Sequence, residues 1–167
     1  MKRISTFLLL LGFAASAGHA QLGAAYDGGR TRLSLGGGYG SFNDQDYFVL
    51  GAGAGYYLFE GFEAGVDGEA WLGSRPHIYT LSPEATYILP LETGWKPYIG
   101  GFYKRTFYDS ELDSINSAGG RAGATTAFGE HTSVNAGLVY EKLFHCDTHV
   151  YSSCTLVYPE LGFSFSY

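Results

Sequence analysis

The segment from His131 to Asn135 (H-T-S-V-N) is the one stretch of the sequence that suggests covalent catalysis. A histidine that takes the proton of a serine hydroxyl makes that oxygen a nucleophile. His131 and Ser133 therefore support one hypothesis, an enzyme that attacks an acyl group. The alternative, which we favour, places His131 in a turn and Ser133 at the start of the strand that follows it.

Cys146 and Cys154 are the only cysteines of the chain, and a short polar stretch separates them. Two neighbouring cysteines in an oxidising compartment form a disulfide. We expect this bond, and closing so small a loop should stabilise the fold by roughly 2–3 kcal/mol. The Cys-x-x-His spacing is also typical of a zinc site. That alternative would use His145, Cys146, Asp147, His149 and Cys154 as ligands, and it requires thiols that stay reduced outside the cell.

The first 20 residues predict that the chain is exported. A basic start at residues 1–3 precedes an apolar run at 4–17, and small residues stand one and three places before a cut at Gln21. No later stretch approaches the roughly 20 apolar residues of a transmembrane helix. We expect residues 1–20 to be a signal peptide and residues 21–167 to form one domain, since no linker or repeat divides them.

The composition indicates that apolar residues alternate with polar ones along the chain. The sequence is 46% hydrophobic and 17% aromatic and has 25 glycines, yet only 16% of its residues are charged and its mean hydropathy is −0.02. An apolar outer face and a polar interior average out in this way along the strands of a membrane barrel. The net charge of −6 argues against a nucleic-acid partner, because proteins that bind nucleic acids carry an excess of basic residues.

The clearest alternation runs from Phe62 to Leu72. Apolar side chains such as Val66 take one face, and the other face holds Glu63, Asp67 and Glu69. A period of two predicts a strand, and no lipid-facing surface would accept those carboxylates.

Eight such runs predict an all-β fold, namely an eight-stranded antiparallel up-and-down transmembrane β-barrel. The expected strands are residues 31–40, 47–58, 62–72, 78–89, 96–107, 121–128, 133–144 and 155–167. Connections after the second, fourth and sixth strands should be tight. The segments 108–120 and 145–154 should be longer loops on the extracellular side.

Two local features qualify this pattern. Pro83 cannot donate to a strand ladder and therefore predicts a bulge or bend. Aromatic residues should form two girdles at the membrane interfaces. We expect one girdle to contain Tyr87, Trp95 and Tyr98 and the other to contain Trp71, Tyr103 and Tyr108.

The interior of so narrow a barrel should be filled by its own side chains. The alternation places nine charged residues there: Arg32, Glu63, Asp67, Glu69, Glu84, Lys104, Arg121, Glu141 and Glu160. A bulge would turn Arg105 inward in place of Lys104. Buried carboxylates need ion pairs, hydrogen bonds, or bound water and cations. We expect a hydrated structural plug, and a small cation channel is the alternative.

The last eight residues (E-L-G-F-S-F-S-Y) alternate in the same manner and end on an aromatic side chain. They resemble the C-terminal assembly signal of bacterial outer-membrane proteins. The positions that carry this resemblance are Glu160, Gly162, Phe163, Phe165 and Tyr167.

With the signal peptide, the run from Ser82 to Tyr87 and the strand opening at 97–101, this ending makes the chain resemble the OmpA/OmpX-type superfamily of eight-stranded outer-membrane barrels. The resemblance covers nearly all of residues 21–167. It implies a monomer without a cofactor in the outer membrane of a Gram-negative bacterium. It also implies contact with outer-membrane lipid and, during biogenesis, with the barrel assembly machinery.

Members of this superfamily share an architecture but differ in activity, so the fold does not decide the function. We expect a structural or surface-interaction role, with an extracellular or envelope ligand at the loops 108–120 and 145–154. The segment at His131 and Ser133 resembles the H-x-S-N segment of outer-membrane lipid A deacylases, although Val134 separates Ser133 from Asn135. A lipid A-modifying barrel enzyme is therefore an alternative.

Overall fold

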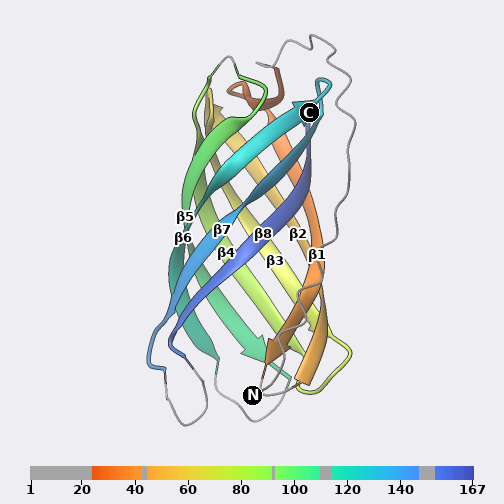
Figure 1. The fold of residues 1–167 in the computed structure, drawn as a ribbon, viewed down its shortest axis with the longest axis vertical. Helices are drawn as coiled ribbons and strands as arrows, with labels where there is room; N and C mark the ends of the chain where they lie inside the picture. Colours follow the sequence, from red (N-terminus) through yellow and green to blue (C-terminus); the bar gives the residue numbers. More distant parts are fainter. Residues whose placement is uncertain (1–23, 43–44, 92, 110–113, 147–152) are drawn as a thin grey trace, which may run out of the picture.

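Eight antiparallel strands close into a barrel in the computed structural model of the chain (Figure 1). The structure describes residues 24–42, 45–91, 93–109, 114–146 and 153–167, so the expected signal peptide lies outside the described residues. The strands are β1 (Thr31–Phe42), β2 (Gln45–Phe59), β3 (Phe62–Leu72), β4 (Ile78–Ile88), β5 (Lys96–Tyr108), β6 (Ile115–Phe128), β7 (Thr132–Leu143) and β8 (Thr155–Ser166). The predicted up-and-down barrel is confirmed.

Each strand pairs with its neighbours in the sequence, and β1 closes the barrel against β8 from Arg32↔Ser166 to Leu35↔Phe163. A short 3-10 turn, η1 (Ala24–Tyr26), precedes β1. None of the helical segments in the described part of the chain is long and apolar enough to cross a membrane.

The two ends of the barrel differ. The C-terminus lies at one end, which we call the C-terminal end, with the connections after β2, β4 and β6 (Figure 1). Gly61 and Gly129 adopt positive φ angles of 74° and 77° in two of these turns, a conformation that favours glycine. The opposite end, the loop end, carries the other four connections. The lengths of the connections follow the expected alternation only in part. At the loop end, where longer connections were expected, residues 43–44 alone join β1 and β2. At the C-terminal end, where tight turns were expected, residues 89–95 join β4 and β5.

Strand β6 starts six residues earlier than the composition suggested. It begins at Ile115, so residues 115–120 belong to the barrel wall and the expected loop 108–120 shrinks to 109–114. The small residues of this stretch resemble a loop in composition, but in the structure they allow close packing. A Cβ at Gly119 would collide with the Phe102 ring and the Tyr140 carbonyl oxygen, so glycine lets these groups approach the strand closely.

Pro83 does not introduce a bulge, which was one of the two expectations for it. The β4–β5 pairs Leu81↔Arg105 and Glu84↔Phe102 keep one register on both sides of Pro83, so no extra residue is inserted. No pair is formed between them at Ser82 and Pro83, which fits a proline that lacks the N–H donor.

Two members of the expected girdles point into the barrel instead. The Tyr98 side chain is buried, and its hydroxyl donates to Glu160 across the interior. Trp71 shares the face of Glu63 and Asp67, and its indole N–H donates to Glu69. Strand alternation therefore overrides the tendency of aromatic residues to lie at the interface. Trp95 and Tyr103 are exposed, as expected.

Candidate functional site: the charged interior of the barrel

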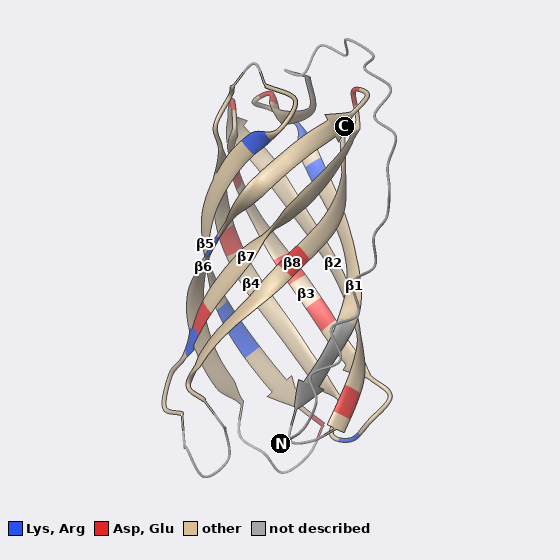
Figure 2. Ribbon diagram, in the orientation of Figure 1, with Lys and Arg blue, Asp and Glu red and all other residues tan. Residues whose placement is uncertain are grey.

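The chemistry-bearing residues of the described chain gather on the inner wall of the barrel. The structure places all nine predicted interior charges on the inward positions of their strands. Charged positions are spread along the length of the barrel wall (Figure 2). Lys104 is inward and buried while Arg105 is exposed, because β5 pairs with β6 in a single register without a bulge.

Six of these residues form what we call the central network: Arg32, Glu63, Asp67, Glu84, Arg121 and Glu160. Its two guanidinium groups bridge four carboxylates, so the network carries two formal negative charges more than positive ones. Five different strands supply its members, which ties opposite walls of the barrel together.

Glu84 is shared by both arginines of the central network. Its Oε1 lies 2.8 Å from Arg32 Nη2 and its Oε2 lies 2.8 Å from Arg121 Nη1. Arg32 also donates from Nε to Glu63, and Asp67 lies within 4.0 Å of both guanidinium groups. Planar guanidinium groups suit this use because each presents several N–H donors in a fixed geometry.

A second cluster lies around Lys104, nearer the loop end. Lys104 Nζ lies 2.9 Å from Glu141 Oε2 and 3.1 Å from the Tyr158 hydroxyl. The carboxylate of Glu141 also accepts hydrogen bonds from Ser117 Oγ at 2.6 Å and from the Tyr158 hydroxyl at 2.9 Å. The buried charge of Glu141 is thus matched by one cation and two hydroxyl donors. Glu69 stands apart and accepts from Trp71 Nε1 at 3.3 Å and Thr80 Oγ1 at 3.4 Å.

Glycines on β2 make room for the carboxylates of β3. A Cβ at Gly53 would collide with the Asp67 carboxylate, and one at Gly55 would collide with the carboxylate of Glu63. The G-A-G-A-G run of β2 therefore places its glycines inward and its alanines outward, opposite the acidic face of β3.

The C-terminal end of the barrel is closed by the segment before β1, which the sequence patterns did not identify. Ala25 and Tyr26 are buried and pack with Tyr57, Ile88 and Tyr98. Because of its burial the pKa of the Tyr26 hydroxyl is raised, so it stays protonated and can share a hydrogen bond with Thr125 Oγ1 at 3.0 Å. The Tyr26 carbonyl oxygen accepts from the Gly61 N–H at 3.0 Å.

A small cavity separates this closure from the central network. Its volume is about 50 Å³, and the residues that line it include Tyr26, Tyr57, Tyr98, Glu84 and Arg121. A cavity of this size holds a few water molecules. Among the described residues, Glu84 Oε2 and Arg121 Nε are buried and make ion-pair contacts without a hydrogen bond, so water in the cavity would complete their coordination.

Lys96 is a further interior cation that the sequence reasoning missed. It is buried on the inner face of β5, and its Nζ lies 5.7 Å from the centre of the Tyr26 ring. Its position has the same parity as Lys104, so strand alternation extended to the first residue of the strand would have found it.

The residues of the catalytic hypothesis do not form a nucleophile–base pair. His131 Nδ1 lies 2.8 Å from the Ser166 carbonyl oxygen, and the ring stacks on Tyr167. Ser133 is buried inside the barrel, where its Oγ bonds Ser164 Oγ at 2.7 Å. A serine that faces the interior cannot reach a lipid on the outer wall, so this geometry does not support the alternative of a lipid A-modifying enzyme. His131 lies in the turn before β7 and Ser133 near the start of that strand, which is the placement that we favoured.

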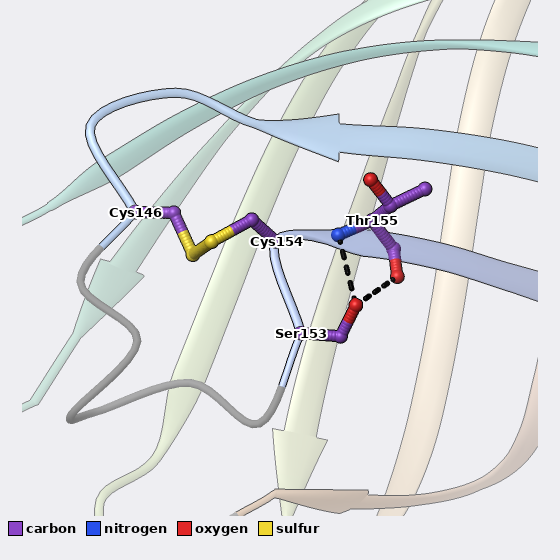
Figure 3. The surroundings of a disulfide bond; sticks show 4 residues. All are labelled: Cys146, Ser153, Cys154 and Thr155. Carbon is purple, nitrogen blue, oxygen red and sulfur yellow. Dashed lines mark hydrogen bonds between the residues drawn. A yellow bond between two sulfur atoms is a disulfide. The ribbon is translucent and has the colours of Figure 1, made fainter.

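Cys146 and Cys154 form a disulfide in the connection between β7 and β8 (Figure 3). Their Cα atoms lie 5.7 Å apart, and the loop is further held by Leu143 N–H, which donates to the Cys154 carbonyl oxygen at 2.9 Å. Ser153 Oγ accepts from the Thr155 N–H at 3.2 Å beside it. The bond removes both thiols from the zinc alternative. Of its other members, His145 is described, whereas Asp147 and His149 lie outside the described residues. Within the described ranges no group of three metal-binding side chains occurs.

The residues of the expected assembly signal lie on both faces of β8. Phe163 and Tyr167 are exposed and Phe165 is half-buried, while Glu160 points inward to Tyr98 and Arg121. Gly162 lies against the Asn135 side chain of β7, where a Cβ would be crowded.

Solved structures with the same architecture are bacterial outer-membrane barrels. No protein-family model and no curated protein matches the sequence. The N-terminal β-barrel domain of Pseudomonas aeruginosa OprF is 18% identical with a TM-score of 0.63, and the match covers 84% of this chain and 98% of that one. For Neisserial surface protein A the identity is 16% and the TM-score 0.56, over 82% of this chain and 94% of the other.

A third similar structure is the outer membrane protein OprG of Pseudomonas aeruginosa, with 13% identity and a TM-score of 0.51 over 86% of this chain and 98% of that one. Identities this low reflect a shared architecture and do not extend to activity. The chain therefore has the fold of the eight-stranded outer-membrane β-barrels.

Proposed function

We propose that the chain is an outer-membrane β-barrel protein of a Gram-negative bacterium, with a structural or surface-interaction role and an interior sealed by its own polar side chains. The observation that carries this proposal is the contrast between the two faces of the barrel wall. Large apolar side chains such as Leu138, Leu161 and Ile99 are each more than 60% exposed. A closed barrel with an apolar outside satisfies its backbone internally and can lie in hydrocarbon.

The sealed interior supports a structural role over transport. The central network bridges the barrel, and the Tyr26 segment closes its C-terminal end. Eight strands leave little more room than side chains fill. A small cation channel remains the second candidate, because six inward carboxylates face only four inward cations, among them Lys96.

Contact with partners would involve the outer wall and the loop end. Outer-membrane lipid would cover the apolar wall, and the barrel assembly machinery would recognise β8 through Phe163, Phe165 and Tyr167. A surface ligand would bind at the loop end, around residues 109–114 and the disulfide-linked segment 145–154. Exposed loops on a rigid scaffold are the usual place for such recognition. We propose that the barrel acts as a monomer.

The test of insertion is membrane fractionation combined with a heat-modifiability gel of the full-length gene product. A folded barrel should be recovered with the outer membrane and should change its gel mobility only after heating. Recovery as a periplasmic monomer outside the membrane would contradict the proposal. The role itself is tested by screening folded barrels against envelope and host-surface extracts, with a variant whose residues 109–114 are replaced by Gly and Ser as control.

A further inference from the structure

The outer wall of the barrel carries a pair of cations that its apolar character does not account for. Strand alternation leaves three charged residues at outward positions of the eight described strands: Asp46, Arg105 and Lys142. Asp46 is on β2, whereas Arg105 is on β5 and Lys142 on β7, with only β6 between them. A charge on the lipid face costs about 2–4 kcal/mol at the midplane and little near the interface.

Both cations lie near the loop end. Arg105 is three residues before the end of β5, and Lys142 is one residue before the end of β7. Arg105 pairs with Asn116 and Lys142 with Ala118, which are successive outward positions of β6. From strand spacing and rise, their Cα atoms are roughly 12 Å apart, so two long side chains can converge on one group.

Aromatic rings flank the two cations. The Arg105 guanidinium lies 5.3 Å from the Phe107 ring centre, and the rings of Tyr103 and Phe144 are 6.2 Å apart. Tyr140, also exposed, precedes Lys142 by one outward position. We call these six residues the outer β5–β7 patch. Rings of this kind lie at the boundary between hydrocarbon and headgroups.

Within the described part of the chain neither cation is in an ion pair. The acid nearest to Arg105 along the described chain, Asp109, lies 3.5 Å from His77 instead. The acid nearest to Lys142, Glu141, faces the interior and pairs with Lys104. Two like charges held this close at the edge of hydrocarbon favour an anion that bonds both. A guanidinium suits a phosphate because it can donate two parallel hydrogen bonds, and a lysine adds a point charge.

We propose that the outer β5–β7 patch binds the phosphate-bearing headgroup of a saccharide lipid in the outer leaflet, with Arg105 and Lys142 bonding the phosphate and the flanking rings contacting the sugar and upper acyl chains. This inference rests on the proposed insertion with the loop end outward. It predicts a lipid held at one position on the wall, in addition to the lipid that surrounds the whole barrel.

The test uses the folded mature chain in neutral phosphocholine nanodiscs that contain a few per cent of lipid A as the probe, with bound lipid counted by native mass spectrometry. Wild-type protein should retain lipid A over phosphocholine. Arg105→Gln and Lys142→Gln should each lower the preference for lipid A about five-fold, because one basic residue near an anionic lipid headgroup strengthens binding by about that factor. The double variant should lower the preference further. Arg105→Lys keeps the charge and should retain most of the preference.

Arg30→Gln is the matched control, because it removes one positive charge at the C-terminal end, where the Arg30 side chain donates to the Glu130 carbonyl oxygen. It should leave lipid A retention unchanged. Equal losses in Arg30→Gln and Arg105→Gln, or equal retention of dephosphorylated lipid A, would overturn the inference. Displacement by millimolar inorganic phosphate would show that free phosphate, and not a lipid, is the ligand. Heat-modifiability of each variant separates these outcomes from a failure to insert.

Discussion

Lys104 and Glu141 form the best-isolated ion pair of the barrel interior. Both side chains are largely buried, and removing one member leaves the other charge uncompensated. We predict that Lys104→Met destabilises the folded barrel by about 3–5 kcal/mol. Replacing both residues, as in Lys104→Met with Glu141→Leu, should recover most of that loss, because neither member of the pair is left as an unpaired charge. Equilibrium urea unfolding in neutral lipid vesicles measures both effects.

Lys142→Met provides the control for this pair. Lys142 follows Glu141 in the sequence but lies on the exposed outer face of β7. The free energy of unfolding of the Lys142→Met variant should therefore stay within about 0.5 kcal/mol of the wild-type value. A Lys104→Met variant as stable as Lys142→Met would mean that water already screens the interior pair.

Val66 and Asp67 test the register of β3, since they are adjacent in sequence and lie on opposite faces. Val66 is exposed on the outer wall, while Asp67 lies between the two arginines of the central network. Val66→Arg should lower stability by roughly 2–4 kcal/mol if the site is near the bilayer midplane. Asp67→Asn should be milder because its amide still bonds polar neighbours. Urea unfolding of both variants decides the ranking, and the reverse order would indicate that β3 is shifted by one residue.

At the scale of residues, alternation predicted more than residue type did. The alternation of side chains along each strand placed Glu63, Glu84 and Lys104 inward from the sequence alone, because successive side chains of a strand point to opposite faces. Judging by type placed Tyr98 and Trp71 in the outer girdles, where the same alternation would have turned them inward. The partners of each charge could not be read from the sequence, since they come from strands far apart in the chain.

At the scale of the element, β8 both closes the barrel and ends in exposed aromatic side chains. Deleting Tyr167 or replacing Phe165 with Asp should reduce the folded fraction in the outer membrane, because the lipid-facing end of the strand is lost. The folded fraction is measured by heat-modifiability after fractionation. Ser166→Thr, at the inward position between them, is the control, and normal assembly of both test variants would contradict a signal role for this ending.

The connection between β7 and β8 contains the disulfide, and its state is testable in intact cells. Cys146 and Cys154 should resist a membrane-impermeant thiol reagent until a reductant is added. Replacing both by Ser should lower stability by roughly 2–3 kcal/mol through the entropy of the open loop. Free labelling of both thiols without a reductant, or zinc that copurifies and protects them, would restore the metal alternative.

Boundaries of elements were less predictable than their existence. All eight strands were found, but the start of β6 was missed because its Ser, Ala and Gly residues match a loop in composition. What makes them a strand is non-local, namely pairing with β5 and the close approach of Phe102 to Gly119. The closing segment at Tyr26 was missed for a similar reason, since a single turn has no period to detect.

At the scale of the whole molecule, the proposed seal of the interior has two parts along the length of the barrel. The Tyr26 segment closes the C-terminal end, and the central network spans the interior beyond a cavity of about 50 Å³. The two parts depend on different forces: the first on aromatic packing, the second on ion pairs. Removing either one leaves the other in place.

We therefore predict that the mature chain in planar lipid bilayers shows no large, steady conductance, and that Tyr26→Ala does not create one. Loss of the Tyr26 ring would widen the cavity toward the C-terminal end and admit more water, but the arginine-bridged carboxylates still cross the interior. Adding Arg32→Ala and Arg121→Ala removes those bridges and leaves four carboxylates without their cations, so this triple variant should pass small cations if it folds. Single-channel recording of the three proteins, each first shown to be heat-modifiable, compares them directly. A large cation-selective current in the wild type would make the channel alternative correct, and a current in Tyr26→Ala alone would show that the central network does not seal.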